Sequence, residues 1–269
     1  MSFNPASIID IHTHAWPEKV SQKARENLEV LFKVKLIGDP TVATLLSYMD
    51  KNGITESVVC GVATRQDQVA GINDWLFTVR SERIKIFCAL HPDYPQWKKE
   101  LVRIRDKGDG IKFQPEFQNF YVDEERLSGM YEAIEESGLP VLFHCGEELS
   151  GTMLVRSAPE RIMKVKKRFP GLTIIAAHFG GFNMLKEVEK RIVGKDVYLD
   201  TAFFFNYISK EEACRLIMKH RPDRLLFGTD FPLIDQEVDI SFLKNLEIPD
   251  SLKERIFSQN ARGLLNRKK

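Results

Sequence analysis

The sequence predicts a single-domain α/β protein, a (β/α)8 TIM barrel over residues 1–269. Eight short runs rich in Ile, Val, Leu and Phe alternate with longer charged segments of helical period, as buried parallel strands alternate with helices. The length of 269 residues also matches the roughly 250 residues of such a barrel. An open doubly wound sheet is the alternative, but no apolar run leads into a GxGxxG turn, and no linker or repeat divides the chain.

The expected elements follow one another in order along the chain. The strands are the apolar runs at 7–14, 57–64, 84–92, 110–115, 139–146, 172–181, 196–202 and 224–232. The helices are expected at 41–52, 67–82, 95–107, 123–137, 158–169, 183–193, 209–220 and 250–265. Glycines after helices (Gly53, Gly138) and capping residues before them (Ser209, Asp250) support these bounds.

Two connections are longer than a barrel needs. The insertion at 15–40 contains a helical stretch and is expected to lie over the barrel mouth as a lid. The segment at 116–123, after strand four, is aromatic and polar and is expected to be irregular. Loops on this side of a barrel usually shape access to the site.

The composition excludes several classes of protein. The 39 basic and 38 acidic residues give a net charge of +1, which argues against nucleic-acid binding. No segment approaches the roughly 20 apolar residues of a membrane helix. The four cysteines are scattered and no secretory signal is visible, so we expect a cytoplasmic protein with free thiols.

Polar side chains gather at the carboxyl ends of the expected strands, where a barrel places its chemistry. Five of the six histidines lie there, and an aspartate ends strand eight. In chain order these residues are His12, His14, His91, Lys112, Gln114, His144, His178 and Asp230. Such a concentration at one end of the barrel predicts a functional site.

The His12-x-His14 spacing favours a metal site. Residues i and i+2 of a strand point the same way, so both imidazoles can face the barrel axis. His144, His178 and Asp230 reach the same region from later strands. Alone, two such histidines are weak evidence, but together the set predicts a divalent metal site, first for Zn²⁺, with Mn²⁺, Fe²⁺ or Co²⁺ as alternatives.

The motifs DIHTH, GIKFQP, VLFHCG, AAHFGG, LLFGTDFP and SQNARGLL together resemble the amidohydrolase superfamily. They are most similar to its amidohydrolase-2 branch, which includes aminocarboxymuconate-semialdehyde decarboxylase. The resemblance implies that His12, His14, His144 and Asp230 bind the metal. It also implies that His178 is a catalytic acid or base and Asp230 a proton shuttle.

The resemblance leaves the number of metal ions open. A single ion is favoured, and Lys112 is then a cation facing the substrate or an ammonium paired with an acidic neighbour. In two-metal members a carboxylated lysine bridges the ions, and Lys112 stands at the matching position.

Two activities fit these residues. A divalent metal lowers the pKa of bound water to about 7, which suits a hydrolase acting on a small carboxylate, lactone, ester or amide. The alternative is a metal-dependent non-oxidative decarboxylase, a lyase with the same ligands. A barrel that holds metal without turnover is a third reading, but structural zinc sites are normally closed by four local ligands.

The substrate contacts are expected near the same end of the barrel. Arg65 and Arg156 follow strands two and five, and either guanidinium can hold a carboxylate through two hydrogen bonds. Lys112 and His91 are further candidates for lining the pocket. We expect a small-molecule substrate as the partner, and the resemblance allows a homodimer.

Overall fold

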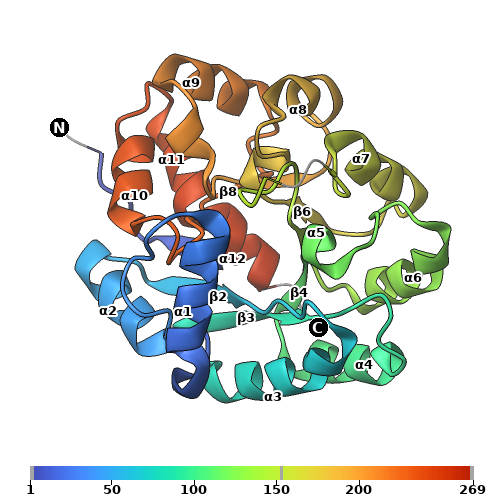
Figure 1. Cartoon of the computed structure of the whole chain (residues 1–269). Helices are drawn as coiled ribbons and strands as arrows, with labels where there is room; N and C mark the ends of the chain where they lie inside the picture. The colour runs from blue at the N-terminus through green and yellow to red at the C-terminus, as the bar shows by residue number, and fades with distance from the viewer. Residues whose placement is uncertain (1–2, 152–153, 267–269) are drawn as a thin grey trace.

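The computed structural model describes residues 3–151 and 154–266, and it confirms the TIM barrel. Eight parallel strands pair in the order of the sequence (Figure 1). The amides of Ile11 and His14 then donate to the carbonyls of Phe227 and Phe231, at 2.9 and 2.7 Å, which joins the first strand to the last segment. The strands are β1 Ile9–Thr13, β2 Glu56–Cys60, β3 Ile84–Ala89, β4 Gly110–Phe113, β5 Val141–Phe143, β6 Ile174–Ala176, β7 Tyr198–Asp200 and β8 Leu225–Leu226.

Helices surround the strands, and all eight of the predicted helices are present. They are α2 Val42–Asn52, α3 Val69–Val79, α4 Trp97–Lys107, α6 Ser128–Ser137, α7 Pro159–Arg168, α8 Leu185–Arg191, α9 Lys210–Lys219, and α11 Asp250–Glu254, which continues through a π turn into α12 Asn260–Leu265. Two helices were not expected. The segment predicted to be irregular begins with α5 Pro115–Gln118, and α10 Gln236–Lys244 follows strand eight.

The predicted insertion contains a helix, α1 Glu18–Phe32. Of its residues, all of them described, Ser21 alone is buried. Arg25 on this helix pairs with Asp39 at 2.9 Å, and Glu29 accepts the amide of Leu36 at 3.0 Å. These contacts fasten α1 to the segment that follows it in sequence, whereas its other side lines the cavity described below.

A bulge in β1 decides which side chains face the barrel axis. Ile9 and Ile11 pack inside the barrel, so strict alternation would turn His12 outward. The register shifts by one residue between Asp10 and Thr13, which pair with Ser57 and Val59. An extra residue in a strand re-aims the side chains that follow it. The bulge therefore lets both Ile11 and His12 face inward, although they are adjacent in sequence.

The core has two layers. Side chains inside the barrel, such as Val58, Phe87, Leu142 and Leu226, form one apolar cluster. The alternate residues of the same strands pack outward against the helices and form the larger cluster. Both faces of each parallel strand are therefore buried, which requires apolar side chains at nearly every position of the strand. This requirement explains the near-continuous apolar runs of the sequence.

Gly146 shows how closely the loop after β5 packs near the site. Its φ is +92°, and an added Cβ would lie 2.2 Å from the Phe182 amide nitrogen. We expect Gly146→Ala to lower the free energy of unfolding by about 2–5 kcal/mol, since strain and a backbone clash add together. Gly138→Ala is the control, because Gly138 has a φ of +71° and nothing within 4 Å of an added Cβ. It should cost only about 1–2 kcal/mol in the same urea titration, and equal losses would contradict the prediction.

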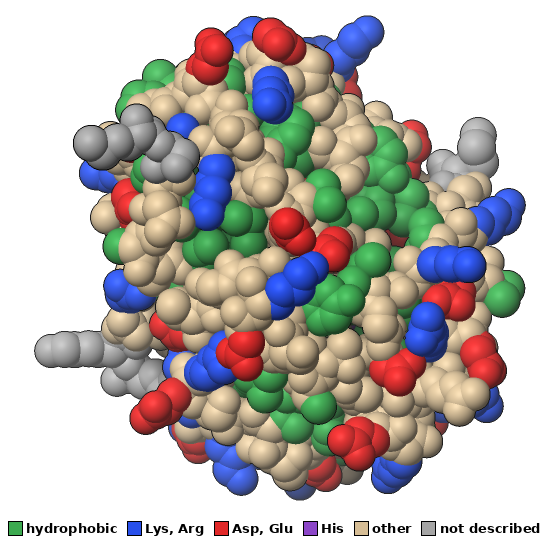
Figure 2. All heavy atoms as spheres, turned by 90° about the vertical axis from the view of Figure 1, so that its left-hand side faces the viewer, with side chains coloured by type: hydrophobic (Ala, Val, Ile, Leu, Met, Phe, Trp, Pro, Cys, Tyr) green, Lys and Arg blue, Asp and Glu red, His purple; other side chains and the backbone are tan. Residues whose placement is uncertain are grey.

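Charges are mixed over the surface. On the face shown in Figure 2, lysine and arginine side chains alternate with acidic ones and do not form a single patch. Among the described residues, no helix has the length and apolar character needed to cross a bilayer. The expectations that the chain binds no nucleic acid and lies in the cytoplasm stay predictions.

Candidate metal centre

Three of the four predicted ligands form one compact group. The ligand atoms of His12, His14 and Asp230 all lie within 4.8 Å of one another. Asp230 Oδ1 is 3.2 Å from His14 Nε2 and 3.7 Å from His12 Nε2. The amide of Asp230 donates to the carbonyl of His12 at 2.8 Å, so β1 directly positions the segment that carries the carboxylate.

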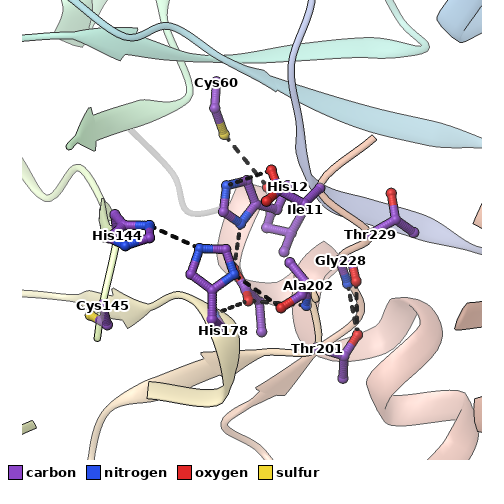
Figure 3. Close-up of polar contacts among 12 residues, drawn as sticks. Ile11, His12, Cys60, His144, Cys145, His178, Thr201, Ala202, Gly228 and Thr229 are labelled. Atoms are coloured by element: carbon purple, nitrogen blue, oxygen red, sulfur yellow. Dashed lines mark hydrogen bonds and ion pairs between the residues drawn. The ribbon is translucent and has the colours of Figure 1, made fainter. Parts of the chain in front are cut away.

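The fourth predicted ligand, His144, lies beside His178 rather than in this group. His144 directly follows β5, and its Nδ1 is 3.0 Å from His178 Nε2. Figure 3 shows the contact between the two rings, which meet at an angle, with the His12 ring next to that of His178. All these histidines and Asp230 line the same cavity.

Each of the four histidines has one ring nitrogen held by an acceptor. Nδ1 of His12 meets Asp200 Oδ2 at 2.9 Å, Nδ1 of His14 meets the Cys60 carbonyl at 3.0 Å, and Nδ1 of His178 meets the Ala202 carbonyl at 3.0 Å. For His144 the held atom is Nε2, which lies 3.2 Å from the Glu147 carbonyl and 3.0 Å from Glu148 Oε1. The opposite nitrogen of each ring contacts Asp230 or another of the four histidines.

These contacts fit a divalent metal ion. An imidazole whose proton is held on one nitrogen offers a lone pair at the other, which is how histidine binds metal. When His144 Nε2 and His178 Nδ1 donate to their carbonyl acceptors, the other two ring nitrogens carry bare lone pairs. These two atoms, His144 Nδ1 and His178 Nε2, lie 3.0 Å apart, a contact that requires a cation or a shared proton between them. Nitrogen ligands with one carboxylate suit Zn²⁺, Mn²⁺, Fe²⁺ or Co²⁺.

The electrostatics keep these ligands in their metal-binding forms. Burial lowers the pKa of His12 and His144 well below the usual value, and that of His178 to about 4. Burial works to raise the pKa of Asp230, but the imidazoles of His12, His14 and His178 hold it well below its usual range. At neutral pH His12, His144 and His178 are therefore neutral imidazoles, and Asp230 is an ionised carboxylate.

Two site residues have a left-handed backbone that non-glycine residues rarely adopt. The φ of His178 is +57° and that of Asp230 is +64°. Such conformations cost of order 1–3 kcal/mol and persist where the surroundings impose them, often at functional sites. His178 begins a short turn, His178–Gly180, beyond the end of β6, and the sequence does not reveal this geometry.

Lys112 on β4 is buried and points into the centre. Its Nζ lies 3.1 Å from Nε2 of His12, the atom that would bind the metal. The Lys112 charge works to lower the pKa of the buried acids Asp200 and Glu148, and the reading of Lys112 as an ammonium paired with an acidic neighbour stays a prediction. Its roles as a substrate-facing cation or a carboxylated bridge stay predictions.

The centre opens into a cavity of about 720 Å³. Its walls are largely apolar and aromatic, with contributions from Trp16, Trp75, Phe117, Phe182 and Phe203. One side of α1 completes the wall through Val20, Lys23, Ala24, Asn27, Leu28, Leu31 and Phe32. The inserted helix thus lies over the cavity, as expected of a lid.

The structure does not bring the other predicted substrate contacts to this cavity. The exposed Arg65 pairs with Asp67 at 3.0 Å. Arg156 pairs with the buried Glu116 at 3.4 Å, and the buried His91 accepts the amide of Asp93 at Nδ1. None of the three is among the described residues that line the cavity, so their contact with substrate stays a prediction.

Sequence reasoning missed two buried acids of the centre. Asp200 ends β7 and contacts His12, and its position at a strand end is a signal that could have revealed it. Glu148 lies in the loop after β5, lines the cavity and accepts from Gln114 Nε2 at 2.5 Å. Burial and the neighbouring Asp230 raise the pKa of Glu148 to about 8. No periodicity marks a loop residue of this kind.

Comparison with known structures shows the same barrel in several enzymes. A 2,6-dihydroxybenzoate decarboxylase from Rhizobium is 17% identical, with a TM-score of 0.74 over 96% of this chain and 98% of that one. The 5-carboxyvanillate decarboxylase from Sphingomonas paucimobilis is 14% identical, with a TM-score of 0.73 and the same coverage. A dihydroxybenzoic acid decarboxylase from Polaromonas, solved with manganese and the inhibitor 2-nitroresorcinol, is 17% identical, with a TM-score of 0.72 over 96% of each chain. At these identities the likeness shows the fold.

The sequence comparison identifies the family. A search of curated protein sequences finds no match. The amidohydrolase family model of the amidohydrolase-2 type matches residues 9–267, which is nearly the whole chain and includes every residue of the proposed centre. The chain therefore belongs to the amidohydrolase family, as its motifs indicated.

Proposed function

We propose that the protein is a metal-dependent non-oxidative decarboxylase acting on a small aromatic carboxylic acid. The observation that carries this proposal is the position of the His12, His14 and Asp230 group at one end of a largely apolar cavity. Similar barrels belong to decarboxylases of dihydroxybenzoate and 5-carboxyvanillate. These findings support the decarboxylase alternative better than the hydrolase that the sequence first suggested.

The cavity suits a flat substrate with an anionic group. Its volume of about 720 Å³ lies within the range of about 300–1,000 Å³ for small-molecule sites. Aromatic side chains can pack against a substrate ring, and the bound metal would hold anionic oxygens of the substrate. Apolar walls also strip water from the carboxylate, whose charge is lost when CO₂ leaves.

The reaction needs one proton at the carbon that loses CO₂. The bond from ring carbon to carboxylate breaks, its electron pair stays on the ring, and a proton taken from solvent water forms the new C–H bond. His178 has its Nδ1 held by the Ala202 carbonyl and presents Nε2 to the centre, so this nitrogen can take up a proton and pass it on. Lys112 is the buried cation beside this site, where it can face the substrate anion.

The deciding experiment measures products. The metal-loaded protein is incubated with 2,6-dihydroxybenzoate and 5-carboxyvanillate, and separately with lactones, esters and amides. We expect released CO₂ and the matching arene in equal amounts from at least one carboxylate. Hydrolysis of a lactone, ester or amide without CO₂ release from any acid would overturn the proposal and restore the hydrolase.

Metal removal gives a second prediction. We propose one divalent ion per chain, with Zn²⁺ or Mn²⁺ as the candidates. Dialysis against a chelator should reduce turnover to below about 1%, because the ion supplies the main binding site for the anionic substrate. Activity should return on adding one equivalent of the native ion, as checked by elemental analysis. Two ions per chain would instead favour the carboxylated Lys112 bridge.

A further inference from the structure

Asp200 is a buried carboxylate whose two oxygens are both occupied. It ends β7, and its side chain has no exposed surface. Oδ2 lies 2.9 Å from His12 Nδ1. Oδ1 accepts two backbone amides, that of His178 at 2.8 Å and that of Ala202 at 3.2 Å.

The contact with His12 sets the position of a proton. A neutral imidazole carries a single proton, and a carboxylate beside Nδ1 keeps it on that atom. The lone pair is then on Nε2, the atom 3.7 Å from Asp230 Oδ1. Together with Lys112 Nζ, 3.1 Å from Nε2, Asp200 thus selects the form of His12 that can bind a metal.

The same carboxylate also holds both sides of His178. One of its contacts is the amide of His178 itself, whose φ of +57° needs support from its surroundings. The other is the amide of Ala202, whose carbonyl receives Nδ1 of the His178 ring. Movement of Asp200 would therefore alter the backbone of His178 and the acceptor that orients its ring.

We propose that Asp200 is the positioning residue of this centre, joining the tautomer of His12 to the direction of His178. Its effect on His12 is independent of the reaction, whereas its effect on His178 rests on the proposed function. The competing interpretation makes Asp200 a metal ligand, since ligand atoms of His12, His178 and Asp200 also lie within 4.8 Å of one another. The occupied oxygens and the absence of Asp200 from the described cavity lining argue against this.

The test is Asp200→Asn, measured by metal binding. Asparagine has one acceptor oxygen for three donors, so its NH₂ group must face at least one of them. We expect Co²⁺ and Zn²⁺ affinity to fall about 10–100-fold in competition with a chromophoric chelator, as for other residues that orient a metal-binding histidine. The visible spectrum of the Co²⁺ form should shift, because His12 reorients.

Asp239→Asn is the matched control. Asp239 is equally buried, and burial raises its pKa well above the usual value, so asparagine closely replaces its neutral form. This variant should keep the affinity and the Co²⁺ spectrum of the wild type. Wild-type values for Asp200→Asn would overturn the proposal, and so would a loss of metal as complete as that of Asp230→Asn, which would make Asp200 a ligand.

A measurement on the unmodified protein tests the proposal even if the Asp200→Asn variant fails to fold. Nitrogen-15 NMR of histidine-labelled, metal-free protein reports which ring nitrogen carries the proton, and His12→Gln assigns the signal. We expect the proton of His12 on Nδ1. A proton on Nε2 would overturn the proposal. Neither this result nor the metal affinity depends on whether the enzyme releases CO₂.

Discussion

Replacing Asp230 with asparagine is expected to abolish turnover, with kcat/KM falling at least about 10³-fold as a metal-holding carboxylate is lost. Asp230 is the one carboxylate in the compact group with His12 and His14. Its ionised form is maintained by the surrounding imidazoles, which hold its pKa well below the usual range against the effect of burial. A neutral amide cannot supply this charge. Metal content and the rate of CO₂ release are the measurements.

The control for this variant is Asp67→Asn. Asp67 is exposed and pairs with Arg65 at the surface, so its replacement should leave metal content and turnover unchanged. Asparagine tolerates the left-handed backbone that Asp230 adopts, and we therefore expect the Asp230 variant to fold. A folded variant that kept both metal and activity would show that Asp230 has been misassigned.

The second large effect is expected for His178→Asn. Turnover should fall about 10²–10⁴-fold, the usual contribution of a proton-transferring side chain, while the metal stays bound. Asparagine suits the φ of +57° at this position, so backbone strain does not confuse the result. Elemental analysis together with the rate separates the two roles, because metal loss equal to that of Asp230→Asn would make His178 a ligand.

The acid limb of the pH profile tests the same residue. Burial lowers the pKa of His178 to about 4, so Nε2 is free to accept a proton at neutral pH. Wild-type kcat should be constant from about pH 7 to pH 5 and fall as the pH approaches 4, because protonated His178 can no longer take up the proton that it passes on. Unfolded histidine has a pKa near 6.5, so the folded protein should lose stability as the pH falls from about 6.5 toward 4. A rate that drops already between pH 7 and 6 would contradict the low pKa of His178.

The barrel and much of its centre could be predicted because both depend on strand ends. Buried parallel strands appear as apolar runs, and the polar residue that closes each run marks the mouth of the barrel. That reasoning found His12, His14 and Asp230, which the structure brings together. The sequence pattern does not predict where a side chain points once it lies in the loop beyond a strand end. Arg65 and Arg156 follow strands as expected, yet the carboxylates of Asp67 and Glu116 hold them elsewhere.

Helix α10 was missed because its inward face is partly polar. Gln236 and Asp239 are both buried, and Gln236 donates to Asp10 at 3.1 Å. A helix whose buried side contains an amide and a carboxyl group lacks the apolar stripe used to recognise helices. Asp10, which accepts the hydrogen bond of the buried Gln236 amide, lies 226 residues away in sequence. No local sequence pattern can show this contact.

The extra residue in β1 has a consequence for how such a site can change over time. The side chains of Ile9 and Ile11 pack in the barrel interior. Those of His12 and His14, which come after them in the strand, belong to the candidate metal site. Because the offset separates two side-chain phases within one strand, a mutation that reshapes the interior need not rotate the ligands. A lineage can therefore adjust the stability of its barrel and the chemistry at its mouth as two largely independent traits.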